Sequence, residues 1–198
     1  MSMKELNVKF NGISPLLLNN PQMVDVFNGY SKEMKKITNK RSKTDEDHLA
    51  ISDIEMKAKI YWDDELGIYV PSRWLLAAFA KISFKTVKIS KDNIRAGVFV
   101  VQDKAKLEYR GVKNVKTAID VTQNPDFRHR MILPQQKIRI AKTTPIFHDW
   151  SFEFDIEFDD KIIDDTAMEQ LLHHMGKYGG FGDFRPTFGR ALAEVKHA

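Results

Sequence analysis

The clearest chemical pattern in this 198-residue chain lies near its carboxyl end. Residues 176–190 read GKYGGFGDFRPTFGR and hold five of the ten glycines. Cations are interleaved there with aromatic rings: Lys177, Tyr178, Phe181, Arg185 and Arg190, with Phe184 and Phe188 as further rings. Cations neutralise phosphates while rings stack on bases, so the pattern favours contact with single-stranded nucleic acid. The alternative is a glycine-rich turn whose rings join the core.

Charge is divided unevenly along the chain, although the net charge is only +4. Residues 1–80 are neutral, 81–145 carry +10, 146–175 carry −8 and 176–198 carry +2. Such a basic block usually faces an anionic partner. Its candidate contacts are Lys113, Lys116, Arg128, Arg130, Lys137, Arg139 and Lys142. The alternative is that the basic block pairs with the acidic block that follows it.

Residues for metal-free RNA cleavage are also present, because a histidine can act as general acid and base. His129 lies between two arginines, and His148 precedes Asp149. Asp45 lies in an acidic segment where a loop aspartate could serve a nuclease. These three are weaker candidates than the binding residues, and an endoribonuclease is an alternative function.

Several classes of site are excluded or unsupported. The chain has no cysteine, which excludes disulfides and thiolate zinc sites and is typical of the cytoplasm. It has no phosphate-binding loop of the G-x-x-x-x-G-K-[ST] type, so an ATPase has no support. His173 and His174 are adjacent and point to different helix faces, so they form no metal pair. We expect neither a cofactor nor a metal, and the longest apolar runs are too short to cross a membrane.

The first half of the chain predicts a mixture of strands and helices. Alternation predicts a strand at 5–13, and helical spacing predicts a helix at 22–37. Residues 38–53 are polar and predict a long loop. A hairpin is expected at 56–62 and 67–70, before a helix at 73–82 with Ser72 as its cap.

The second half predicts a β-rich insertion and then a return to the core. Short strands are expected at 98–101, 106–109 and 137–142, and the clearest strand spans 150–158. A helix follows from Thr166 to Met175, with a Thr166 and Glu169 capping box. We therefore predict one domain, with a core of residues 1–83 and 146–198 and a basic insertion at 84–145.

The two ends of the chain resemble a known family. The segments GISPLLLNNP, DDELGIYVPSRWLLAAF and GGFGDFRPTFGRALAEV occur in the order typical of the RAMP superfamily, the repeat-associated proteins of CRISPR systems. This resemblance could also reflect a phage or mobile-element relative. It covers about half the chain and leaves residues 84–145 unmatched. Of the family's binding residues it carries over only Arg73.

The resemblance implies an α+β fold with a ferredoxin-like (RRM-like) βαββαβ core. It also implies RNA binding across the sheet face, the glycine-rich loop and the insertion, with subunits that stack along the strand. We therefore expect a soluble, cytoplasmic subunit that binds single-stranded nucleic acid, RNA rather than DNA. It is expected to assemble as a homo-oligomer or with other ribonucleoprotein subunits. A filament-forming structural protein is a further alternative. The binding hypothesis requires the cations of the insertion and of the tail to share one face.

Overall fold

The computed structural model describes residues 3–111, 118–135 and 138–197. The chain divides into two compact units. The first unit consists of Met1–Leu17, Ile68–Lys113 and Phe147–Ala198, and the second of Leu18–Gly67 and Asn114–Ile146. Residues 84–113 thus belong to the first unit, and residues 18–67 to the second, which differs from the division expected from the sequence.

A four-stranded sheet forms the centre of the first unit. Its strands are β1 (Met3–Gly12), β5 (Val98–Val100), β9 (Ser151–Asp159) and β10 (Ala191–His197). Their order in the sheet is β10-β1-β9-β5, and every neighbouring pair is antiparallel. The predicted strands at 5–13, 98–101 and 150–158 are therefore confirmed, with ends shifted by one or two residues.

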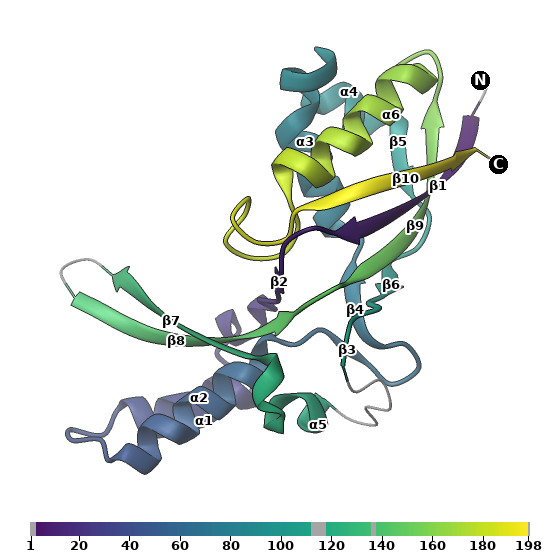
Figure 1. The fold of residues 1–198 in the computed structure, drawn as a ribbon. Helices are drawn as coiled ribbons and strands as arrows, with labels where there is room; N and C mark the ends of the chain where they lie inside the picture. The colour runs from purple at the N-terminus through teal and green to yellow at the C-terminus, as the bar shows by residue number, and fades with distance from the viewer. Residues whose placement is uncertain (1–2, 112–117, 136–137, 198) are drawn as a thin grey trace. The chain divides into compact units, whose positions relative to one another are not determined.

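Three helices of the first unit pack close to this sheet or to one another: α3 (Arg73–Val87), α4 (Lys91–Gly97) and α6 (Asp165–His174). Figure 1 shows α3 and α6 lying together on one face of the sheet. The alternation of β1 explains why, since Leu6, Val8 and Phe10 are buried toward this side. The α6 cap is Asp164, whose carboxylate accepts a hydrogen bond from the Ala167 N–H at 2.8 Å, so the predicted Thr166 cap is wrong.

Short strands complete the first unit. They are β2 (Leu16–Leu17), β4 (Gly67–Pro71) and β6 (Lys104–Lys106), and β4 pairs with β6 in antiparallel register. Within the described residues, no helix is long and apolar enough to span a membrane.

The second unit combines helices with a long β-hairpin. Its helices are η1 (Pro21–Val24), α1 (Gly29–Thr38), α2 (Asp45–Lys59), α5 (Ala118–Gln123) and η2 (Pro125–Phe127). Its strands are β3 (Trp62–Asp63), β7 (Arg128–Gln135) and β8 (Ile138–Phe147), of which β7 and β8 form the hairpin. Figure 1 shows α1 and α2 side by side.

Further predictions about local structure are wrong, including the strand at 56–62, whose first four residues belong to α2. The predicted loop at 38–53 contains the start of α2, and the segment at 84–113 contains α4 and the last turn of α3, so it is less rich in strands than expected. Thr44 and Asp47 cap α2 reciprocally, and Asp45 and Glu46 lie in its first turn, where negative charge is favourable. The acidic residues that we expected in a loop therefore form the start of a helix.

Candidate nucleic-acid interface

The glycine-rich segment forms a loop that is pinned by backbone hydrogen bonds within the first unit. After α6 the chain makes a wide turn, η3 (Met175–Gly179), and then runs alongside residues 15–17. The Asp183 N–H donates to the Leu17 carbonyl at 3.0 Å, and the Gly189 N–H donates to the Pro15 carbonyl at 2.8 Å. We call residues 176–190 the glycine loop.

Close backbone approach explains the glycines of this loop. A Cβ atom on Gly182 would lie 2.3 Å from the Leu17 carbonyl oxygen, and one on Gly189 would lie 1.8 Å from that of Phe181. Both residues also have positive φ, +72° and +75°. The absence of side chains therefore lets the loop lie directly on neighbouring backbone.

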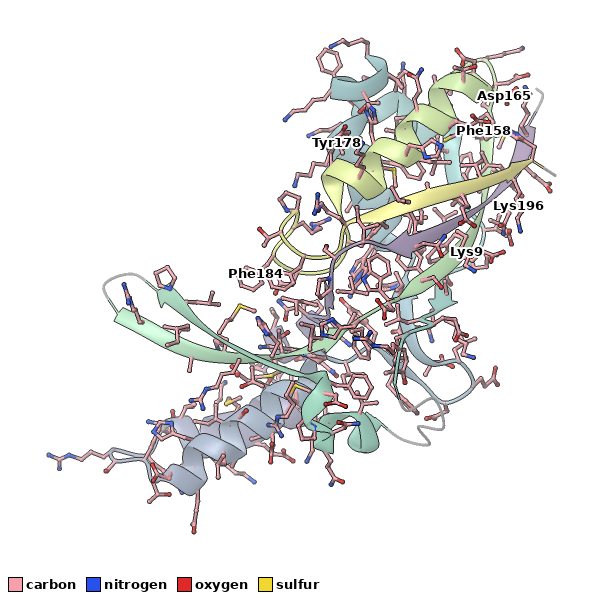
Figure 2. All side chains as sticks on the ribbon, viewed as in Figure 1. Lys9, Phe158, Asp165, Tyr178, Phe184 and Lys196 are labelled. Atoms are coloured by element: carbon pink, nitrogen blue, oxygen red, sulfur yellow. The ribbon has the colours of Figure 1, made fainter. Side chains whose placement is uncertain are left out.

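The glycine loop exposes rings as well as cations. Tyr178 is 57% exposed and Phe184 is 39% exposed, and Figure 2 labels both side chains. Lys177 lies over the Tyr178 ring, with Nζ 5.4 Å from the ring centroid. Arg190 is exposed and Arg185 is half-buried. Five side chains of the types needed for phosphate and base contact are thus present on one loop.

Phe181 does not belong to this surface, which corrects the prediction. Its ring is fully buried and packs edge-on against Phe10 and Phe152, with centroid distances of 4.7 and 5.0 Å. It also meets Trp150. Phe181 therefore anchors the loop in the core and has no face on which a base could stack.

In the second unit, α2 holds the base of the β7–β8 hairpin. The Thr143 N–H donates to Glu55 Oε2 at 2.7 Å, and the Ser52 and Thr143 hydroxyls lie 2.7 Å apart. Lys59 donates to the Thr143 carbonyl. Because three side chains of one helix bind the same hairpin residue, the hairpin is fixed relative to α2.

A basic groove lies between α2 and this hairpin. It has a volume of about 380 Å³ and is lined by Lys43, His48, Ile51, Ser52, Glu55, Arg130, Arg139, Ile140, Ala141 and Thr143. We call it the hairpin groove. The register pairs Arg130 with Thr143 and Arg139 with Pro134, which places both arginines on the same face of the hairpin. The sequence named these two arginines but gave no sign of Lys43 and His48.

Two other predicted cations already have carboxylate partners. Arg128 Nη2 lies 2.6 Å from Asp53 Oδ1, and Lys142 Nζ lies 2.9 Å from Glu55 Oε1. Glu55 is only 3% exposed, so the Lys142 ammonium compensates a buried carboxylate. These two residues join α2 to the hairpin, and their charges are less available to phosphate than those of Arg130 and Arg139.

Of the remaining predicted contacts, the structure describes Arg73 alone. Arg73 is exposed at the first turn of α3 in the first unit. Lys113, Lys116 and Lys137 lie outside the described residues.

The weak catalytic candidates are divided between the two units. Asp45 lies in the first turn of α2, where it stabilises the helix end, and His129 is the second residue of β7 in the same unit. His148 lies in the first unit, and its neighbour Asp149 is paired with Arg110 at 2.8 Å. Among the described residues, no group of three or more acidic or histidine side chains could hold a metal ion.

The open face of the first unit's sheet is acidic. Outward positions of β1, β9 and β10 carry Glu5, Glu153, Asp155, Glu157, Asp159 and Glu194, against Lys9 and Lys196. Figure 2 labels these two lysines on neighbouring strands. Because carboxylates repel phosphates, this face does not suit the RNA contact across the sheet that the resemblance implied.

Comparison with known proteins shows likeness in structure alone. No family profile and no curated protein matches the sequence. A chain of the type III-B Cmr-beta complex, solved by cryo-electron microscopy with cognate target RNA bound, aligns with a TM-score of 0.52 at 10% identity. The alignment covers 98% of this chain and 59% of that chain. A crystal structure of oligomeric Cmr4 from Pyrococcus furiosus aligns over 100% of this chain and 99% of that chain, with a TM-score of 0.44 and 10% identity.

The alignment shows that this chain shares, over nearly its whole length, the fold of that chain of the type III-B Cmr-beta complex. At 10% identity, this likeness is one of fold alone. The mixed α and β class predicted from the sequence is confirmed with it. The chain spans 59% of the length of that neighbour.

Proposed function

We propose that this protein binds single-stranded nucleic acid, RNA rather than DNA, as a subunit of a ribonucleoprotein assembly. The observation that carries the proposal is the hairpin groove, where Arg130, Arg139 and Lys43 line one cavity with His48. The fold supports it, because a chain of the Cmr-beta complex, which was solved with target RNA bound, shares this fold. The β1-α3-β5-β9-α6-β10 order supports a ferredoxin-like core as the scaffold.

The groove matches the chemistry of a nucleic-acid strand. Arginine forks bind phosphate oxygens in pairs, and Lys43 adds a point charge at the same cavity. Ile132 is 70% exposed on the hairpin face that also carries Arg130 and Arg139. An exposed apolar side chain between cations can pack against an unstacked base. The glycine loop offers Tyr178 and Phe184 as stacking rings beside Lys177 and Arg190.

Assembly is part of the proposal. We infer that copies of this chain, or this chain and other subunits, lie side by side along one RNA in the cytoplasm. The acidic sheet face of the first unit repels the phosphates of the RNA. It therefore favours binding of the RNA at the hairpin groove and the glycine loop.

Charge reversal in the hairpin groove tests the proposal. The double change Arg130→Glu and Arg139→Glu should weaken binding of a fluorescein-labelled oligo(U) of about 20 nucleotides by about tenfold or more. The salt dependence of log affinity should become shallower by about 1.4, because two phosphate contacts are lost at about 0.7 each. Fluorescence anisotropy over a salt series measures both quantities.

The matched control reverses the two lysines of the acidic sheet face. Lys9→Glu and Lys196→Glu change the net charge by the same amount as the arginine pair. Both lysines lie outside the hairpin groove and the glycine loop. This variant should retain the salt slope of the wild type. Equal losses in the two double variants would show that affinity follows net charge alone and would remove the hairpin groove from the site.

A further inference from the structure

A short loop of the second unit presents three apolar side chains to solvent. Val24, Val26 and Phe27 are 82%, 53% and 78% exposed, and they lie at the connection between η1 and α1. A contiguous group of large, exposed apolar side chains is uncommon on a soluble protein and indicates a surface that binds something. We call residues 24–27 the apolar loop.

Hydrogen bonds at both ends hold the apolar loop in place. The Asp25 carboxylate accepts a hydrogen bond from the Phe27 N–H at 2.9 Å, and the Asn28 N–H donates to the Asp25 carbonyl at 3.2 Å. The buried Ser31 hydroxyl donates to the Met23 carbonyl at 2.8 Å. The apolar side chains are therefore held outward before any partner binds, which lowers the entropy cost of binding.

The first unit has an apolar groove between α3, α4 and β5. It has a volume of about 440 Å³ and is lined by Leu76, Ala77, Phe79, Ala80, Ile94, Arg95, Val98, Phe99 and Val100. Leu76 on α3 and Phe99 on β5 are each 46% exposed, so the groove is open to solvent. We call it the α3 groove.

The α3 groove is large enough for an aromatic ring. An apolar cavity of about 150 Å³ can hold a benzene molecule, and the volume of this groove is more than twice as large. It therefore has room for the Phe27 ring together with a valine of the apolar loop.

The charges of the two surfaces are complementary. The apolar loop carries one charged residue, Asp25, and the lining of the α3 groove carries one of opposite sign, Arg95. Arg95 lies 3.6 Å from Asp92, but these side chains are 69% and 92% exposed, and exposed pairs of this kind contribute little. The Arg95 guanidinium is therefore available to a carboxylate that arrives with the apolar loop.

We propose that the apolar loop of one copy docks in the α3 groove of a second copy, with Phe27 in the groove and Asp25 beside Arg95. The inference rests on the assembly proposed above and names a protein contact within it. Because the loop and the groove are different surfaces, the contact is heterologous, and copies join in a row or a ring. The contact is small, so its dissociation constant without RNA should be on the order of 10–100 µM.

Sedimentation velocity of the RNA-free protein tests the contact. The average mass of the wild type should rise as its concentration is raised from about 1 to 300 µM, around the expected dissociation constant. Phe27→Ser and Leu76→Glu should each weaken association at least about tenfold, because they remove an apolar anchor from the loop or from the groove. Both positions are well exposed, so both variants should fold. Arg95→Glu should weaken association at least about threefold.

A mixture of the two single variants is the sharpest measurement. The Phe27→Ser copy keeps its groove, and the Leu76→Glu copy keeps its loop, so one intact contact remains between unlike copies. An equimolar mixture should therefore form heterodimers with the wild-type affinity and nothing larger. A mixture that stays monomeric would overturn the proposal.

Leu49→Ser and Leu192→Ser are the matched controls. Leu49 is 65% exposed on α2, in the unit of the loop, and Leu192 is 51% exposed on β10, in the unit of the groove. Both variants should associate as the wild type does, and an equal loss in them counts against the proposal. So does a wild type that is monomeric at about 300 µM, well above the expected dissociation constant.

The test separates this contact from nucleic-acid binding. The double variant Arg130→Glu and Arg139→Glu should sediment as the wild type does, because its loop and α3 groove are unchanged. Failure of the hairpin groove to bind oligo(U) and failure of copies to associate are therefore different results. If Phe27→Ser weakens oligo(U) binding but leaves sedimentation unchanged, the apolar loop contacts RNA and not a second copy, and the proposal is wrong.

Discussion

Gly189 lies where the two ends of the glycine loop meet. Its own carbonyl accepts the Phe181 N–H at 2.8 Å, and a Cβ at this position would lie 1.8 Å from the Phe181 carbonyl oxygen. Both neighbours are backbone, so neither can rotate away. The residue therefore determines whether the loop can close over residues 15–17.

We predict that Gly189→Ala destabilises the protein by about 2 kcal/mol or more, from the positive φ and the backbone clash together. Gly29→Ala is the control, because Gly29 is the first residue of α1 and has no atom within 4 Å of an added Cβ. That change should be neutral or stabilise the protein by up to about 1 kcal/mol. Urea unfolding midpoints measure both. Equal stability of Gly189→Ala and the wild type would contradict the loop geometry.

Two aromatic residues of the glycine loop show that sequence spacing does not decide which ring is buried. Phe181 and Phe184 both stand among glycines and cations, yet the first is fully buried and the second is 39% exposed. Gly182 at φ +72° separates them and changes the chain direction. Alternation assigns faces only while the backbone stays regular, so the sequence predicted a mixed loop but not which ring packs inside.

At the scale of elements, the start of α2 is a compact charge cluster. Asp47 Oδ1 lies 2.6 Å from Lys40 Nζ, and Oδ2 accepts from the Thr44 N–H at 3.2 Å. The hydrogen bond from Lys40 and that from the Thr44 backbone hold the pKa of Asp47 below its ordinary value. Because this pKa is lower in the folded state, the stabilisation is present above the unfolded pKa and is lost as the pH falls through the folded value.

We predict that Asp47→Asn lowers the thermal unfolding midpoint at pH about 7 and that the difference from wild type shrinks toward pH about 3. As the pH falls through the folded-state pKa, which lies below the ordinary value, the wild-type carboxyl itself becomes protonated. Asp45→Asn, an equal change of charge at an exposed position of the same turn, should show a smaller difference. Circular dichroism melts across the pH range provide the measurement. A pH-independent difference would show that Asp47 acts by shape and not by charge.

The same element explains why residues 38–53 were predicted as a loop. The apolar residues of α2 that are buried, Ile54, Met56 and Ala58, lie in its second half. Its first turn is charged, and this end of the helix is held by the capping box and by the Lys40–Asp47 ion pair. Composition therefore resembled a loop up to residue 53, while the strands at 5–13 and 150–158 were visible from their regular alternation.

At the scale of the whole molecule, the chain passes between the two compact units four times, after Leu17, Gly67, Lys113 and Ile146. A sequence read from end to end favours contiguous segments, whereas the contact between α2 and the β7–β8 hairpin joins residues about ninety positions apart. The resemblance at the two ends indicated the fold. It could not locate the hairpin groove, because Lys43 and Arg130 come together only through this long-range pairing.

The proposed assembly of several copies along one RNA leads to a prediction about stoichiometry. If copies bind side by side, the number of chains per RNA should rise in steps as oligo(U) is lengthened from about 12 to 24 to 48 nucleotides, since each chain covers a fixed length. Native mass spectrometry at low protein excess counts them, with Arg130→Glu and Arg139→Glu as the variant that should place fewer chains on each RNA. One chain per RNA at every length would contradict assembly. Oligomers of constant size with and without RNA would instead favour a structural filament, because subunit contacts alone would then set the size.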